Sequence, residues 1–154
     1  MSAERQEILN FVNGKFIKSS NGSTFENFDP TTGVAFANMH EASEADVDAA
    51  VTAAQAARAG EWGKMTVAGR VDLLNKVADR INERFDEFLA AECLDTGKPY
   101  SLASHIDIPR GAANFKIFAD VIKNVPTECF RMETPDGAGA LNYGVRVPKG
   151  VIGV

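Results

Sequence analysis

The sequence has little of several features that would assign it to a class of protein. Its 154 residues include only two cysteines, Cys93 and Cys129, too few for a disulfide framework. No apolar run approaches the roughly 20 residues of a membrane-spanning helix. The first residues also lack the continuous apolar core of a secretory signal. We therefore expect a cytoplasmic protein without a membrane partner.

Concentrated positive charge is also missing. The chain carries 16 basic and 21 acidic residues, a net charge of -5, and no cluster of Lys or Arg. A nucleic-acid surface needs a basic patch or stripe, so nucleic acid is excluded as a partner. With 45% hydrophobic and 24% charged residues, the composition is that of a globular chain rather than a disordered one.

Short β-ribbons are predicted over the first forty residues. Asn13 and Gly14 separate the stretches ILNFV and KFI, and both residues tolerate the positive φ of a type I′ hairpin turn. Residues 29–33, with the sequence DPTTG, join TFENF to VAFANM in a second predicted hairpin.

Helices are predicted next. Ser43 and Asp46 resemble a capping box, and Gly60 is expected to end the helix that they begin. A helical apolar period then continues for about six turns, with a break near Asn82. It predicts burial against a sheet rather than a coiled coil, because paired flanking charges are missing. Its apolar positions are Val67, Val71, Leu74, Ala78, Ile81, Phe85 and Phe88.

A further helix is predicted after the LDTGKPY segment. Gly97 suits a helix C-cap, and Pro99 lies just beyond it. Pro109 suits the first turn of the next helix, where its missing N–H costs nothing. The buried face of that helix is expected to contain Ile108, Ala112, Phe115, Phe118 and Ile122.

Two strands are predicted near the carboxyl end. Residues 141–147 alternate, with Leu141, Tyr143, Val145 and Val147 on one side. Residues 151–154 form a largely apolar run after a Pro-Lys-Gly turn, which is typical of a buried strand. A buried strand needs neighbours, so we expect it to be the first strand of a sheet that this chain leaves incomplete.

The polar residues alone do not assemble an active site. Cys93 lies between carboxylates, and Cys129 lacks an activating base or cation, so both are expected to be inert thiols. His40 and His105 are far apart and near no cysteine, which argues against a His-based metal site. Glycines near the carboxyl end supply only half of a dinucleotide fingerprint, because the helix that should follow them is missing.

Several motifs in order resemble the start of NAD(P)-dependent aldehyde dehydrogenases. They are FVNGKF, FDPTTGVAFANM, ASEADVDAAVTAAQAA, LDTGKPY and VPKGVIGV. The segments DIPRGAANFKIFAD, TECFRM and LNYGVRVPKGVIGV resemble the branch that oxidises 2-hydroxymuconic and 2-aminomuconic semialdehydes. The resemblance implies an α/β fold, of which this chain is the amino-terminal part. The expected elements are β-hairpins, helices, an oligomerisation strand and the first strand of an incomplete Rossmann-like sheet.

The same resemblance implies an organisation. Residues 1–137 would begin the NAD-binding domain, residues 138–148 would form an oligomerisation arm, and residues 149–154 would be the first strand of the nucleotide-binding sheet. The arm would make a homo-oligomer through strand 141–147. The family's catalytic Cys and Glu and its cofactor-binding residues lie further on, so no catalytic or cofactor-binding residue is assigned here. We expect an NAD-dependent enzyme whose first 154 residues are inactive alone. The choice between NAD and NADP, and the choice between a dimer and a tetramer, are left open.

Two sites are implied by the resemblance. Arg110 would bind the carboxylate of the semialdehyde substrate; the alternative is a surface Arg paired with Asp107 or with solvent. A monovalent cation would lie between the Asp95 carboxylate and the backbone carbonyls of Asn27 and Phe28. The alternative there is that Asp95 caps local backbone N–H groups.

Two other interpretations of the chain are open. It could be a standalone, non-catalytic module that pairs with full-length subunits through its exposed strands. It could also belong to an aldehyde dehydrogenase of broad specificity, an interpretation that depends on the role of Arg110. The codon that follows Val154 in the gene would separate the module from the amino-terminal part of an enzyme.

Overall fold

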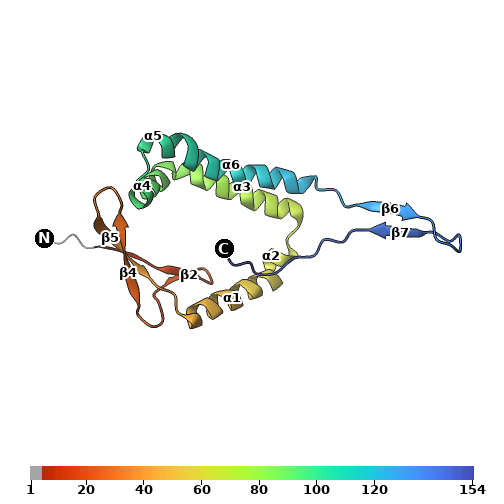
Figure 1. Ribbon diagram of the computed structural model, residues 1–154, viewed down its shortest axis with the longest axis horizontal. Coiled ribbons are helices and arrows are strands. Elements are labelled where there is room, and N and C mark those ends of the chain that lie inside the picture. Colours follow the sequence, from red (N-terminus) through yellow and green to blue (C-terminus); the bar gives the residue numbers. More distant parts are fainter. Residues whose placement is uncertain (1–4) are drawn as a thin grey trace.

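The structure is a computed structural model that describes residues 5–154 (Figure 1). Its strands are β1 (Gln6–Ile8), β2 (Asn10–Val12), β3 (Lys15–Ile17), β4 (Thr24–Asp29), β5 (Val34–His40), β6 (Cys129–Met132) and β7 (Ala140–Tyr143). Its helices are α1 (Glu44–Ala59), α2 (Glu61–Lys64), α3 (Val67–Glu83), α4 (Phe85–Thr96), α5 (Tyr100–Leu102), the π-helical turn η1 (Ala103–Asp107) and α6 (Ile108–Lys123). Within the described residues, none of these helices combines the length and apolar character needed to cross a membrane.

Both predicted amino-terminal hairpins are confirmed. Strands β2 and β3 are antiparallel around Asn13 and Gly14, whose φ angles of 50° and 77° suit the predicted turn. Strands β4 and β5 are also antiparallel, and β1 adds to β5 in parallel to give the order β1-β5-β4. The register of the β4–β5 pair shifts between Asn27 and Phe28, which leaves Phe36 of β5 as the extra residue of a β-bulge.

The predicted helix ends are largely confirmed. The Ser43 side chain accepts a hydrogen bond from the Asp46 N–H at 3.2 Å, and the Asp46 carboxylate accepts one from the Ser43 N–H at 2.9 Å. This reciprocal pair is the capping box, and Gly60 caps the other end of α1. The break expected near Asn82 falls between α3 and α4, at Arg84.

Pro109 lies in the first turn of α6, as predicted, but this helix does not begin from a loop. Helical backbone starts at Tyr100, passes through η1 and continues into α6 without a loop. A proline inside a regular α-helix removes one hydrogen bond, and its ring clashes with the carbonyl four residues earlier. The π-helical turn η1 ends two residues before Pro109, with the Ile108 N–H bonded to the Ala103 carbonyl five residues earlier, and sequence periodicity does not report such a turn.

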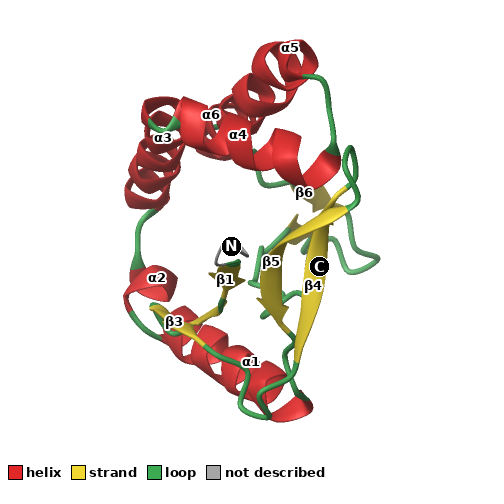
Figure 2. Cartoon of the chain, turned by 90° about the vertical axis from the view of Figure 1, so that its left-hand side faces the viewer, coloured by secondary structure: helices red, strands yellow, loops and turns green. Residues whose placement is uncertain are grey.

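The buried core is small and lies between helices. Leu89, Ala103 and Ile108 form its buried cluster, with Ile81, Phe85 and Cys93 packed against them. Figure 2 shows the helices α3, α4, α5 and α6 gathered at one end, with the three-stranded sheet and α1 below them.

The predicted buried face of α6 is only partly correct. Ile108 and Ala112 are buried, but Phe115, Phe118 and Ile122 are 37%, 65% and 41% exposed. Helix α3 packs along α6, and the buried positions of α6 further along are small alanines, Ala112 and Ala119. One neighbouring helix covers only a narrow stripe, so the aromatic side chains lie outside it.

The carboxyl-terminal strands differ from the prediction. Strand β7 ends at Tyr143 and pairs with β6, whereas residues 144–154 form no strand. Figure 1 shows them as an extended trace running back from β7. Of the strand predicted for residues 141–147 only 141–143 is formed, as part of β7, and the strand predicted for residues 151–154 is absent here. A strand exists only through hydrogen bonds to a neighbour, and no other strand pairs with these residues within the described chain.

Apolar surface is unusually exposed. The chain presents 11789 Å² of accessible area, whereas a compact monomer of 16.5 kDa presents about 7,600 Å². Leu89 is the largest side chain that is fully buried in the described residues. Much of the apolar pattern read from the sequence therefore has no covering partner within residues 5–154.

Candidate functional site

One candidate site lies where α4 meets β4. The Asn27 side-chain amide donates a hydrogen bond to Oδ1 of Asp95 at 2.6 Å, although 68 residues separate the two in sequence. The β-bulge at Asn27 and Phe28 interrupts the strand ladder at this point. Bulges re-aim backbone and side-chain groups next to functional sites. A carboxylate beside backbone carbonyls offers the oxygen ligands that hard cations prefer.

The alternative role for Asp95 is not formed within the described residues. Its side chain bonds Asn27, and no backbone N–H within residues 5–154 donates to it. Those residues also contain no group of three or more His, Cys, Asp or Glu side chains that could hold a metal ion. A cation here would depend on one carboxylate and on carbonyl oxygens.

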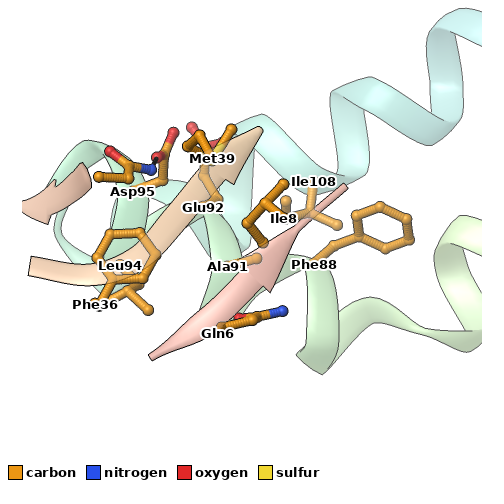
Figure 3. Close-up of a pocket in the computed structure, with 11 residues that line it drawn as sticks. Gln6, Ile8, Phe36, Met39, Phe88, Ala91, Glu92, Leu94, Asp95 and Ile108 are labelled. Atoms are coloured by element: carbon orange, nitrogen blue, oxygen red, sulfur yellow. Dashed lines mark hydrogen bonds between the residues drawn. The ribbon is translucent and has the colours of Figure 1, made fainter. Parts of the chain in front are cut away.

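A cavity of about 400 Å³ opens beside this corner (Figure 3). Its walls are mainly apolar, with Ile8, Phe36 and Met39 contributed by β1 and β5. Figure 3 shows Asp95 and Phe88 at opposite ends of the group of lining side chains. The carboxylate therefore lies at one end of a largely hydrophobic space.

The turn after α4 packs against the β4–β5 loop, which positions this corner. Gly97 has a φ of 69°, as predicted for a C-cap, and a Cβ there would lie 2.9 Å from Cγ of Pro30. Asp29 closes the loop by accepting hydrogen bonds from the Thr31 N–H and hydroxyl at 2.8 and 2.6 Å. These bonds, the Thr31 hydroxyl first, together with the Thr32 hydroxyl, lower the pKa of Asp29.

Arg110 is the second candidate site and lies apart from the first. It is exposed, three residues after the end of η1 and in the first turn of α6. Within residues 5–154 no carboxylate forms an ion pair with it. Asp107, which was the alternative partner of Arg110, instead lies with Oδ2 3.1 Å from Nζ of Lys98. Neither a hydrogen bond nor an ion pair joins Arg110 to Asp95, although Ile108 of the same turn lines the cavity.

The cysteines and His40 differ in burial. Cys93 is half-buried against the core, and Cys129 is exposed on β6; both are free thiols. Nδ1 of buried His40 accepts the Ser19 N–H at 3.1 Å, so Nε2 carries the proton and donates to Glu7 at 3.0 Å. That hydrogen bond is the main reason that the pKa of Glu7 is lowered. Within the described residues, neither sulfur atom forms a hydrogen bond with a charged side chain.

Sequence reasoning missed the contact of Lys98 with Asp107 and with Glu92. Glu92 and Lys98 are six residues apart across a helix end, and Asp107 lies beyond a further helical turn. No periodic pattern links such positions. The position of Lys98 directly after a left-handed glycine does not predict where its side chain points, so only the folded chain shows the contact.

Within the described residues, the carboxyl-terminal glycines do not form a dinucleotide fingerprint. A nucleotide-binding fingerprint needs a strand, a glycine-rich turn and the amino end of a helix that faces the pyrophosphate. Gly150 and Gly153 lie in residues 144–154, which form neither strand nor helix. No step involving a nicotinamide cofactor is therefore assigned to residues of this chain.

The hairpins, helices and β6–β7 ribbon define an amino-terminal part of one family of oxidoreductases. The model of the aldehyde dehydrogenase family matches residues 16–154, so the chain belongs to this family. It is 65% identical over 149 residues to a 2-hydroxymuconic semialdehyde dehydrogenase from Pseudomonas sp. (strain CF600). It is 50% identical to a 2-aminomuconic 6-semialdehyde dehydrogenase from Pseudomonas sp.. The matches cover 97% of this chain but 31% and 30% of those relatives.

Solved structures agree with this assignment. The NAD⁺ complex of an aldehyde dehydrogenase from Bacillus cereus is similar, with a TM-score of 0.81 and 38% identity. The match covers 90% of this chain and 28% of that one. A complex of PnpE with nicotinamide adenine dinucleotide matches with a TM-score of 0.78 and 32% identity, over 91% of this chain and 27% of that one. The predicted family and fold are thereby confirmed, and the chain spans about a third of the length of the relatives it matches.

Proposed function

We propose that the protein containing this chain is an NAD-dependent dehydrogenase that oxidises 2-hydroxymuconic or 2-aminomuconic semialdehyde to the acid. The observation that carries the proposal is 65% identity, over 97% of the chain, to a 2-hydroxymuconic semialdehyde dehydrogenase. The similar structure of an NAD⁺ complex supports the cofactor. We also propose a cytoplasmic location, which the two free cysteines favour. In this proposal the chain supplies scaffold, subunit contacts and one substrate contact.

Arg110 is the proposed substrate contact. Its side chain is exposed, the core beneath it is supplied by Ile108 and Ala112, and Asp107 is engaged elsewhere. A planar guanidinium holds a carboxylate through two parallel hydrogen bonds, which orients the ligand as well as attracting it. A semialdehyde with a carboxylate remote from the aldehyde would be held in this way.

Replacing Arg110 tests the substrate class. Hydrogen bonds to a charged group contribute about 1.5 to 3 kcal/mol, or about 10- to 150-fold in affinity. In the protein containing this chain, Arg110→Ala should raise KM by that factor for a carboxylate-bearing semialdehyde, and far less for an uncharged aldehyde of similar length. Arg80→Ala is the matched control, because Arg80 pairs with Glu83 on an exposed helix face. Equal losses on both substrates would remove Arg110 from the site and weaken the muconic assignment.

A monovalent cation is proposed at the first candidate site. Asp95 would supply a carboxylate, and Asn27 and Phe28 would supply backbone carbonyls at the β-bulge. The 2.6 Å bond between Asn27 and Asp95, which brings the two segments together, supports this proposal. The cation would stabilise the corner between β4 and α4 rather than take part in the reaction.

A subunit contact is proposed for the carboxyl-terminal part. Residues 138–148 would be an arm that joins a neighbouring subunit's sheet, following residues 1–137 of the NAD-binding domain. Residues 149–154 would become a strand only when another strand pairs with them. Exposed apolar side chains on one side support the arm: Leu141, Tyr143, Val145 and Val147 are 67%, 68%, 71% and 75% exposed. An open strand edge readily pairs with another chain.

A further inference from the structure

A cluster of one cation and two carboxylates lies next to the turn that carries Arg110. Lys98 follows the left-handed Gly97, and its Nζ lies 2.9 Å from Oε1 of Glu92 and 3.1 Å from Oδ2 of Asp107. The side chains of Lys98, Glu92 and Asp107 are 37%, 30% and 29% exposed, so water screens their attraction less than that of a fully exposed pair. Glu92 first, and then Asp107, raises the pKa of Lys98, which remains a cation at neutral pH.

The Lys98–Asp107 contact is an ion pair rather than a well-aligned hydrogen bond. Oδ2 of Asp107 is buried and has no hydrogen-bond partner of acceptable geometry within the described chain. Its charge nevertheless lies 3.1 Å from the Lys98 ammonium. A buried carboxylate oxygen is unfavourable unless a cation compensates it. Loss of the Lys98 charge would therefore favour a different cationic partner for Asp107.

Arg110 is the cation placed to become that partner. It follows Asp107 by three residues, and side chains three apart on a helix are neighbours. Asp107 ends η1 with helical backbone angles that continue into α6, and α6 forms a pair of this kind in the same order, because Nζ of Lys123 lies 2.8 Å from Oδ1 of Asp120. Asp107 and Arg110 do not pair in this structure, where Lys98 holds the carboxylate.

We propose that Lys98 is a positioning residue that holds Asp107 away from Arg110 and so leaves the guanidinium free for the substrate carboxylate. The inference rests on the proposed function, in which Arg110 binds that carboxylate. Lys98 makes no contact with substrate in this proposal. It acts by removing an anion that would otherwise compete for the same guanidinium.

Kinetics of three variants of the protein containing this chain test the proposal. Lys98→Met should raise KM for a carboxylate-bearing semialdehyde about two- to fivefold, the range expected from an exposed ion pair that competes for Arg110. KM for an uncharged aldehyde of similar length, and kcat for both substrates, should stay unchanged. Asp107→Asn alone should leave the ratio of the two KM values at its wild-type value. The double variant Lys98→Met/Asp107→Asn should return the ratio to that value, because the competing anion is gone.

Two further variants are matched controls. Lys116→Met breaks a lysine–aspartate pair of 2.8 Å between α6 and Asp79 of α3, and should leave the ratio unchanged. Lys98→Arg keeps the positive charge and should retain the wild-type ratio. If Lys98→Met does not fold, Lys98→Gln takes its place, since its amide still donates to Glu92 but carries no charge.

The outcomes separate this inference from the proposed function. A Lys98→Met ratio equal to that of the wild type would overturn the positioning role. A raised ratio that persists in the double variant would also overturn it, because structural damage is not repaired by removing a second side chain. Arg110→Ala, measured in parallel, tests the substrate contact itself. If Arg110→Ala raises KM selectively for the carboxylate-bearing substrate while Lys98→Met leaves the ratio of KM values unchanged, only the positioning role is overturned. If Arg110→Ala raises KM equally for both substrates, the proposed substrate class is overturned.

Discussion

A buried aspartate ties the amino-terminal ribbons to α1. The Asp46 carboxylate accepts hydrogen bonds from the backbone N–H of Ser43 at 2.9 Å and of Ser20 at 3.1 Å. These bonds, Ser43 first, hold the pKa of Asp46 well below its usual range. Ser19 and His40 are buried beside them, so polar side chains rather than apolar ones join the two segments.

The Asp46 bonds predict a pH dependence of stability. Because folding depresses the pKa of Asp46, its contribution is fully present above the ordinary aspartate pKa of about 4. The contribution decreases as pH falls below that value towards the folded pKa. Asp46→Asn should therefore lower the midpoint of thermal unfolding at pH 7, and its deficit relative to wild type should shrink below pH 4. Asp48→Asn, at an exposed position of the same helix, should show no such change. A deficit that is constant from pH 7 to pH 3 would contradict this origin.

The proposed cation at Asp95 can be tested by its effect on stability. A ligand at ten times its dissociation constant stabilises the folded state by about 1.4 kcal/mol. Potassium chloride should therefore raise the unfolding temperature of the protein containing this chain, relative to a tetraalkylammonium salt of equal ionic strength. Asp95→Asn should abolish the difference, and Asp86→Asn, in the first turn of the same helix, should keep it. An identical response of both variants to potassium would remove Asp95 from the site.

At the scale of elements, the local sequence predicted the hairpin turn and the ends of the helices. Asn13-Gly14 specifies its own turn, Ser43 with Asp46 specifies a helix start, and Gly97 specifies a helix end, because each acts on backbone within a few residues. The π-helical turn was not predicted, since it depends on how Pro109 fits a helix that already continues from Tyr100. Burial along α6 was overestimated, because an apolar period identifies a face without identifying what covers it.

The proposed arm yields a prediction at this scale. The Val145 N–H makes no hydrogen bond within residues 5–154, so Val145→Pro should leave the β6–β7 ribbon intact. The same change removes a donor that a neighbouring subunit's strand would need. Size-exclusion chromatography with light scattering of the protein containing this chain should show dissociation. Val145→Ala keeps the N–H and should dissociate less. Unchanged assembly of the proline variant would exclude an arm at this position.

The candidate sites were less predictable than the elements. The pairing of Asn27 with Asp95 joins segments 68 residues apart, and only the family resemblance placed the two together before the fold was known. Nothing in the sequence indicated that Lys98 and Asp107 form an ion pair. Contacts across such separations depend on how whole elements pack, whereas periodicity describes one element at a time.

At the scale of the molecule, residues 1–154 alone should lack dehydrogenase activity. Residues 144–154 form neither the strand nor the helix of a dinucleotide site, and neither Cys93 nor Cys129 bonds a charged side chain within the described chain. The purified chain should neither reduce NAD with a semialdehyde nor melt at a higher temperature when NAD is added. Bovine serum albumin at equal concentration sets the background rate. Turnover above that rate, or an upward shift with NAD, would contradict this prediction.

The small core of this chain has a calorimetric consequence. The heat capacity of unfolding grows with the apolar area that becomes exposed, and usually amounts to about 12 to 15 cal/mol/K per residue. Here many large apolar side chains are already in water before unfolding, and Leu89 is the largest that is fully buried within residues 5–154. Residues 1–154 should therefore unfold with a heat-capacity change per residue below that range. Their denaturation curves should also be shallow, because the same exposed area sets the dependence of stability on urea.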